Sequence, residues 1–191
     1  MYLTNPYAIS SGYPSGVVAT DNFVRADSGT LGVNWTDLRS TVRCQIVSNE
    51  CQQTAAGYSM ERWAGAGGFN NNQYSKITIA STVLNYDVTI NGSSSVDNST
   101  SYVFGVIAGG NYSLTRRVNE ADTVIDAGAA WTLVAGDVFE IRKTGTTITT
   151  YINTVLKQTV VDATLTGGLP GFNVYGGTGA RSVTVWTGGN V

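Results

Sequence analysis

Residues 21–36 read Asp-Asn-Phe-Val-Arg-Ala-Asp-Ser-Gly-Thr-Leu-Gly-Val-Asn-Trp-Thr, and this stretch decides the fold. Polar groups separate three large apolar side chains, Phe23, Leu31 and Trp35. The spacing has neither the 3.6-residue period of a helix nor the two-residue period of a strand. Two glycines mark tight turns in which φ can be positive. The stretch therefore predicts a folded loop that Phe23 and Trp35 anchor to a hydrophobic core.

The charged residues around this loop predict how it is fixed. Arg25 and Asp27 lie two positions apart, and we expect them to form an ion pair. Arg116 is the other notable charge, because it interrupts the apolar face of residues 112–118. It could bind a carboxylate or an acidic sugar, or it could pair with Asp27 or Asp21. We favour the ion pair, since an arginine beside a core is usually paired.

The composition narrows the class of protein. The chain has 191 residues and a net charge of −2, and only 13% of its residues are charged, against about 25% in an average domain. Its 42% hydrophobic content argues against disorder. The absence of histidine excludes Ser-His-Asp and Cys-His catalysis. No basic run is present, so we expect no nucleic-acid partner.

The two cysteines, Cys44 and Cys51, leave two readings open. They could close a small hairpin as a disulfide, or they could be buried thiols that pack as small hydrophobic groups. Cys44 alternates with Ile46 on one strand face, which suits burial. We favour free thiols, because sequence alone does not establish disulfide geometry.

Short β-type segments separated by turn residues follow the loop to the end of the chain, and no segment has a sustained helical period. About 12 to 14 such strands predict an all-β fold, an antiparallel β-sandwich or jelly roll. No linker or change of composition divides it. Expected hairpin turns include Ser48-Asn49-Glu50, Asn91-Gly92, Gly109-Gly110-Asn111 and Asn153-Thr154.

Several motifs, in order, resemble the concanavalin A-like lectin/glucanase jelly-roll domains found in bacteriophage and bacterial surface proteins. The resemblance covers residues 17–191, taken as a single domain, and leaves residues 1–16 as an N-terminal arm. The motifs are Asp-Asn-Phe-x-Arg-Ala-Asp from Asp21, Leu-Gly-x-Asn-Trp-Thr from Leu31, Asn-Gln-Tyr-Ser from Asn72, Leu-Val-Ala-Gly-Asp from Leu133, Thr-x-Ile-Thr-x-Tyr-Ile-Asn from Thr146, Gly-Leu-Pro-Gly from Gly168 and Trp-Thr-Gly-Gly from Trp186.

This resemblance implies two antiparallel sheets packed face to face, with the opening loop sealing one edge near the last strand. The usual Asn-Gly turn is Asn153-Thr154 here, and we expect it to differ because Thr tolerates positive φ poorly. Relatives that cleave glycans use two carboxylates on one strand. The nearest match, Glu120 and Asp122, falls at a predicted hairpin tip. We therefore expect no enzymatic activity.

Ligand binding would depend on outward-facing side chains. Some relatives of this fold bind calcium, and oxygens of residues 70–72 or of Asp97 and Asn98 could do so here, but the acid count is too low to assign a metal or any other cofactor. Aromatic rings on strands can stack on sugars. The candidate ligand-binding residues are Tyr74, Tyr86, Tyr102, Tyr151 and Arg116.

Three functions compete. The first is a non-enzymatic virion-associated structural or decoration protein of a bacteriophage, attached to a capsid or tail surface. No signal peptide or membrane-spanning run is visible, so we expect synthesis in the host cytoplasm and localisation at the virion surface. The arm, rich in tyrosine, would dock on other virion subunits, and we expect a homo-oligomer that can present a glycan-binding face. A free carbohydrate-binding module or lectin is the alternative, and a glycoside hydrolase is third. The arm residues assigned to docking are Tyr2, Tyr7 and Tyr13.

Overall fold

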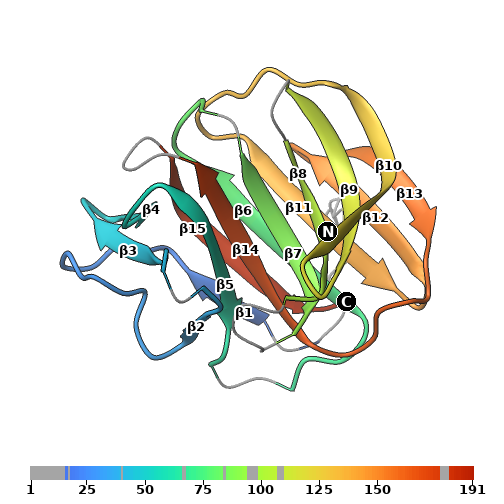
Figure 1. Ribbon diagram of the computed structural model, residues 1–191, viewed down its shortest axis with the longest axis horizontal. Helices are drawn as coiled ribbons and strands as arrows, with labels where there is room; N and C mark the ends of the chain where they lie inside the picture. Colours follow the sequence, from blue (N-terminus) through green and yellow to red (C-terminus); the bar gives the residue numbers. More distant parts are fainter. Residues whose placement is uncertain are drawn as a thin grey trace, which may run out of the picture.

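The computed structural model describes residues 16, 18–39, 41–65, 68–83, 85–93, 99–106, 110–176 and 181–191. Within them the chain forms two antiparallel sheets packed face to face, which confirms the predicted β-sandwich (Figure 1). The described residues hold 15 strands, slightly more than the 12 to 14 expected. They include no helix long and apolar enough to cross a membrane. Residues 1–15 of the arm lie outside the described residues.

One sheet has eight strands: seven in the order β13-β12-β11-β6-β15-β4-β3, and β1, which also pairs with β15. In Figure 1 its ends, β3 and β13, lie on opposite sides of the molecule. The strands are β1 (Val18–Asp21), β3 (Cys44–Val47), β4 (Glu50–Gln53), β6 (Gln73–Ile79), β11 (Val138–Thr144), β12 (Thr147–Ile152), β13 (Val155–Val161) and β15 (Ser182–Asn190).

The other sheet has seven strands in the order β10-β9-β8-β7-β14-β5-β2. Strand β14, which comes late in the chain, lies between β7 and β5 and pairs with both. Segments far apart in sequence are therefore neighbours in this sheet. The strands are β2 (Trp35–Asp37), β5 (Gly57–Trp63), β7 (Tyr86–Gly92), β8 (Ser101–Val106), β9 (Asn111–Val118), β10 (Ala121–Ala130) and β14 (Leu169–Gly176).

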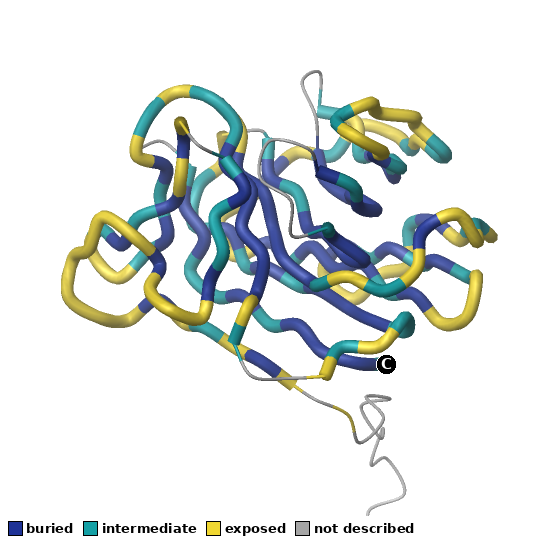
Figure 2. Tube along the Cα trace, turned by 60° about the horizontal axis from the view of Figure 1, so that its bottom comes forward, coloured by how far each residue is buried: buried dark blue, intermediate teal, exposed yellow. Residues whose placement is uncertain are grey.

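The core lies between the sheets because alternate side chains of each strand point inward. On β14, Phe172 and Val174 are buried in the apolar core, and the residues between them point to the opposite face. Figure 2 shows buried residues along the strands and exposed residues in the loops that join them. The outer face of the seven-stranded sheet is therefore free to carry polar groups.

The loop of residues 21–36 is anchored as the sequence predicts. Phe23 and Leu31 are buried, and the Trp35 ring packs edge-on against Phe172 at 5.1 Å and Trp186 at 4.8 Å between ring centroids. Strand β1 pairs with β15, opposite Trp186 at Asp21, which places the loop at the C-terminal strand. Trp35 thus joins the two sheets.

The ionic clasp of this loop differs from the expected Arg25–Asp27 pair. Arg25 binds Asp21 instead, with Nη1 to Oδ1 at 2.7 Å and Nη2 to Oδ2 at 3.0 Å, and it also donates to the Leu31 carbonyl. Asp27 accepts a hydrogen bond from the backbone N–H of Ser48 at 2.9 Å. The expected pair is wrong because Asp21, at the end of β1, offers both carboxylate oxygens to the guanidinium fork.

The structure also shows the state of the two cysteines and the conformation of two predicted turns. Cys44 and Cys51 are free, buried thiols, as favoured. Asn91-Gly92 is not a hairpin turn, because β7 continues through it and the buried Asn91 side chain donates to the Gly167 carbonyl at 2.7 Å. The β12–β13 turn keeps the double positive φ of an Asn-Gly turn, 52° at Asn153 and 68° at Thr154, although Thr occupies the second position.

Candidate functional site

A cleft of about 340 Å³ opens on the outer face of the seven-stranded sheet. Its walls come from β5, β7, β8, β9, β10 and β14, so it depends on the whole sheet. Its lining residues are Tyr58, Asn85, Asp87, Val103, Gly105, Ser113, Thr115, Arg117, Asp122 and Tyr175.

The alternation of side chains along β7 and β8, together with the glycine at position 105, shapes the cleft. Asp87 and Gly105 are directly paired across β7 and β8, and both lie between residues whose side chains enter the core. A Cβ added to Gly105 would lie 2.0 Å from the Tyr86 carbonyl oxygen and 2.2 Å from Asp87 Oδ1. The backbones approach closely here, and the Asp87 carboxylate occupies the place that a side chain on Gly105 would take.

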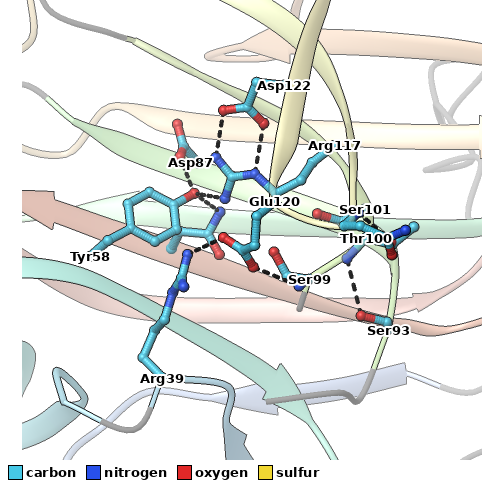
Figure 3. A network of polar contacts seen from close by, with 12 residues as sticks. Arg39, Tyr58, Asp87, Ser93, Ser99, Thr100, Ser101, Arg117, Glu120 and Asp122 are labelled. Atoms are coloured by element: carbon cyan, nitrogen blue, oxygen red, sulfur yellow. Dashed lines mark hydrogen bonds and ion pairs between the residues drawn. The ribbon is translucent and has the colours of Figure 1, made fainter. Parts of the chain in front are cut away.

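Tyr58 is the centre of the polar network in the cleft (Figure 3). Its hydroxyl accepts from Arg117 Nη1 at 2.7 Å and from Asn173 Nδ2 at 2.8 Å, and it donates to Asp87 Oδ2 at 3.3 Å. The Tyr175 ring lies 5.4 Å from the Tyr58 ring and is 49% exposed. One aromatic ring is thus fixed by hydrogen bonds, and a second lies beside it at the surface.

Arg117 is held by an acid on the neighbouring strand. Its Nε and Nη2 donate to the two carboxylate oxygens of Asp122, both at 2.7 Å. The guanidinium also lies 4.8 Å over the Tyr58 ring. A bidentate pair of this kind fixes the orientation of the arginine as well as its charge.

Arg62, on β5, is completely buried and contacts the network through Asn173. Its Nη1 donates to Asn173 Oδ1 at 3.1 Å, so the Asn173 amide nitrogen is left to face Tyr58. Burial lowers the pKa of Arg62 to about 10. The arginine therefore sets which way the Asn173 amide points.

A pair of charges closes one end of the network. Arg39, after β2, pairs with Glu120 in the β9–β10 turn and lies 5.3 Å over the Tyr58 ring (Figure 3). Glu120 also accepts from the Ser99 N–H at 2.6 Å. Glu120 has a φ of 68°, a strained value for a non-glycine residue, and its two partners stabilise it there.

The pKa values of the cleft residues follow their surroundings. Burial raises the pKa of Asp87 to about 6, while the charge of Arg117 and hydrogen bonds from Asn173 and Tyr58 lower it. Burial, and then the charge of Asp87, also raises the pKa of the Tyr58 hydroxyl. Tyr58 is thus protonated near neutral pH, and Asp87 changes charge close to physiological pH.

Three of the four tyrosines expected to face outward are buried. Tyr86 and Tyr102 enter the core, where the Tyr86 hydroxyl accepts from Ser182 N–H at 2.8 Å. Tyr74 is only 2% exposed, so it too cannot stack on a sugar. Tyr151, on β12 of the other sheet, is partly exposed and lies under Arg142 at 4.7 Å. The expectation failed for Tyr86 and Tyr102 because each lies on the apolar face of its strand, beside Val88 and Phe104 respectively, and that face points into the core.

Arg116 has a structural partner rather than a ligand. Its Nη1 donates to Asp162 Oδ2 at 2.6 Å and to Thr164 Oγ1 at 2.9 Å. The favoured ion pair is present, but its acid is Asp162 and not Asp21 or Asp27. The Tyr102 hydroxyl donates to the other oxygen of Asp162 at 2.7 Å.

The oxygens of residues 70–72, considered for calcium, have other partners. Asn71 Oδ1 accepts from Lys143 Nζ at 3.1 Å, and Asn72 Oδ1 accepts from Gly145 N–H at 2.8 Å. The buried Lys143 ammonium also donates to the Leu165 carbonyl, so a cation of the chain itself already lies there. The described residues contain no cluster of three or more acidic, cysteine or histidine side chains suited to a metal. Asp97 and Asn98 lie outside the described residues.

Glu120 and Asp122 do not form a catalytic pair. The backbone and side chain of Ser99 and the charge of Arg39 lower the pKa of Glu120 despite its partial burial. Asp122 is bound through both oxygens to Arg117. The expected turn at Asn119-Glu120 is confirmed, although Asp122 belongs to β10.

A second cleft, of about 290 Å³, lies beside the opening loop. Thr30, Trp35 and Asp37 line it, together with the buried Cys44 and Glu61. Burial and then the nearby charge of Asp37 raise the pKa of Glu61 to about 8. The Glu61 carboxyl accepts from Cys44 N–H at 2.8 Å, which gives it a structural role in joining β5 and β3.

No family model and no curated protein matches the sequence. Solved structures do resemble this chain. The carbohydrate-binding module CBM66 from Bacillus subtilis has a TM-score of 0.60 and 14% identity, covering 82% of this chain and 94% of that chain. The exoplasmic/lumenal domain of VIP36, in a Ca2+/Man-bound form, has a TM-score of 0.62 and 7% identity, covering 84% of each chain. The fold is a concanavalin A-like jelly roll.

A protein of unknown function from Shewanella oneidensis MR-1 also shares the fold, with a TM-score of 0.52 and 11% identity over 92% of this chain and 86% of that chain. At these identities the likeness establishes architecture alone. The site residues of the present chain were missed from the sequence because Tyr58, Asp87, Arg117 and Tyr175 are distant along it. The sequence offered one signal, the adjacent pair Arg116 and Arg117. Neighbouring residues of a strand point to opposite faces, so when Arg116 faces Asp162 on the core side, Arg117 faces the cleft.

Proposed function

We propose that this domain binds carbohydrate in the cleft on its seven-stranded sheet. The observation that carries the proposal is the exposed Tyr175 ring beside a fixed set of hydrogen-bonding groups, Tyr58, Asp87 and Arg117. Sugars offer apolar C–H faces for stacking and hydroxyls for hydrogen bonds, so a ring next to polar groups suits them. The fold shared with CBM66 and VIP36, a carbohydrate-binding module and a mannose-bound protein, supports the same reading by analogy.

A glycan array tests this proposal. Wild-type protein should bind a subset of glycans saturably, and Tyr175→Ala should weaken that binding about tenfold because the stacking ring is lost. Leu156→Ala, also at an exposed apolar position but on β13 of the other sheet, is the control and should bind normally. A silent array, or equal binding by Tyr175→Ala, would count against the cleft.

A glycosidase is the enzymatic competitor, and Asp87 is what favours it, because a raised pKa suits a general acid. The missing part is a free second carboxylate, since Asp122 is engaged by Arg117 through both oxygens. We therefore propose binding without turnover. Incubation with the glycans selected on the array should release no reducing sugar, and release that Asp87→Asn abolishes would establish an enzyme.

Attachment to a bacteriophage virion is a separate proposal that comes from the sequence of residues 1–16. It places the chain, together with capsid or tail subunits, at the particle surface with the cleft available to a glycan. Mass spectrometry of purified particles should then find the chain at high copy, and deletion of residues 1–15 should abolish attachment. Absence from the particles would contradict this localisation while leaving the carbohydrate proposal intact.

A further inference from the structure

We infer that the cleft takes a neutral sugar, and that the ionised Asp87 carboxylate is the acceptor for its hydroxyl groups. The inference rests on the proposed carbohydrate function and adds the class of glycan and the residue that recognises it. Three observations carry it: the hydrogen-bonding capacity left in the network, the position of the Asp87 carboxylate over Gly105 in the cleft and the balance of charge.

The hydrogen-bonding capacity of Tyr58 is fully used. A phenol has two lone pairs and one proton. The lone pairs accept from Arg117 and Asn173, and the proton is directed to Asp87 Oδ2. Tyr58 can therefore offer a ligand its ring but no further hydrogen bond, and recognition of hydroxyls passes to its neighbours.

Asp87 has acceptor capacity left over. A carboxylate offers about four acceptor positions. The Tyr58 hydroxyl takes one, at a long 3.3 Å, and the Asn173 amide provides another hydrogen bond. Asp87 Oδ1 lies over Gly105, in the space that a side chain there would fill, and both residues line the cleft. Two adjacent hydroxyls of a sugar could donate to this carboxylate while the sugar ring stacks on Tyr175.

The charge of the cleft disfavours an anionic sugar. Among its lining residues one guanidinium, Arg117, faces two carboxylates, Asp87 and Asp122. Asp122 already neutralises that guanidinium through a bidentate pair. In the surrounding network Arg39 is paired with Glu120, and the buried Arg62 is balanced by the Asp87 carboxylate that it faces. A sialylated or sulfated sugar would bring a further negative charge to a site whose positive and negative charges already match, and like charges repel. Neutral sugars avoid this cost.

The acceptor role makes binding depend on pH. The groups that face Asp87 are Tyr58 and Arg62 from β5, Asn173 and Tyr175 from β14, Arg117 from β9 and Asp122 from β10; its partner on β8, Gly105, has no side chain. Burial among them raises the pKa of Asp87 to about 6. Below that pH the carboxyl carries a proton and loses acceptor strength, so affinity should fall as pH falls through about 6.

The test is a glycan array of neutral, sialylated and sulfated glycans, read near neutral pH and about two pH units lower, followed by calorimetry on the glycan selected. Wild type should select neutral glycans and bind about tenfold more weakly at the lower pH, the effect of losing a charged hydrogen bond. Asp87→Asn should bind about tenfold more weakly at neutral pH and show no pH response. Asp126→Asn, on β10 outside the cleft, is the matched control and should behave as wild type.

Each contrary result has its own meaning. Preference for sialylated or sulfated glycans, or affinity that is equal at both pH values, would overturn the inference and leave carbohydrate binding in place. Normal binding by Asp87→Asn would do the same for the role of Asp87. No binding of any glycan at either pH would overturn the proposed function itself and the inference with it. The pH series on wild type keeps the test decisive even if Asp87→Asn fails to fold.

Discussion

Among single residues, Thr154 combines a β-branched side chain with a positive φ, a backbone conformation that such side chains disfavour. Its φ of 68° is costly for a β-branched residue. Replacing it with glycine should stabilise the fold by about 1 kcal/mol, because glycine adopts this φ without strain. Chemical denaturation monitored by tryptophan fluorescence would measure the change.

Thr159→Gly is the matched control for this prediction. Thr159 is exposed on β13 of the same hairpin, and its φ is not positive. Glycine there should lower stability by up to about 1 kcal/mol through loss of backbone order and strand propensity. If Thr154→Gly destabilised the protein as Thr159→Gly should, the turn would not have the conformation described.

Glu61 should make stability depend on pH in an unusual direction. Its pKa is raised from 4.5 to about 8, so between these values the folded chain keeps a proton that the unfolded chain has released. Stability should therefore fall as pH rises through this window, by up to about 1.4 kcal/mol per pH unit.

Glu61→Gln should remove most of this dependence and should be more stable than wild type near pH 8. Glutamine keeps an oxygen for the Cys44 N–H and carries no charge to bury. Thermal melts across the pH range would show the effect, with Glu50→Gln at the β3–β4 hairpin as control. A wild-type stability that stays level from about pH 5 to 8, or a parallel curve for Glu61→Gln, would contradict the assignment.

For single residues, the sequence predicts which side chains are buried better than it predicts which charged groups pair. Phe23 and Trp35 are where the motif predicts because large apolar groups in a polar loop can only be buried. The partner of Arg25 is not predictable in the same way, since Asp27 is nearer in sequence but the end of β1 places Asp21 against the guanidinium.

Among the elements, the pairing of β7 with β8 depends on Gly105. Any side chain there would meet the Tyr86 carbonyl at 2.0 Å, a backbone atom that cannot move alone. We expect Gly105→Ala to destabilise the domain by about 2 kcal/mol or more and to reduce glycan binding. Gly29→Ala is the control, because an added Cβ there meets nothing within 4 Å. Equal stability of the two variants would mean that the strands are farther apart than described.

The sequence predicts hairpins well where turn residues sit between two separate strands, as at Ser48-Asn49. It fails at Asn91-Gly92, because the same residues also suit an irregular strand when the Asn side chain finds buried partners. Here those partners, including the Gly167 carbonyl, come from a segment 76 positions away. Local turn chemistry carries no information about such a contact.

For the whole molecule, Trp35 is the side chain that joins the two sheets. It packs on Phe172 and Trp63 of the seven-stranded sheet and on Trp186 of the eight-stranded sheet. Trp35→Ala should cost about 3 to 5 kcal/mol of unfolding free energy. Val33→Ala, two positions away and 96% exposed, should change stability by less than about 0.5 kcal/mol. A small effect of Trp35→Ala would show that the sheets are held together elsewhere.

The overall fold is predictable from the sequence because motifs, turns and apolar segments all agree on a jelly roll. The site is not, because it is formed by the outward-facing residues of six strands and not by any single motif. Tyr58 and Tyr175 are paired across β5 and β14, yet 117 positions separate them. Three of the four tyrosines nominated from the sequence, Tyr74, Tyr86 and Tyr102, are buried.

The most direct test of the account is an NMR titration of isotope-labelled protein with a neutral glycan selected on the array. If the cleft binds the glycan, the backbone amides that shift most should be those of its lining residues Tyr58, Asp87, Arg117 and Tyr175. Shifts concentrated at the second cleft around Thr30, or on the outer face of the eight-stranded sheet, would contradict it.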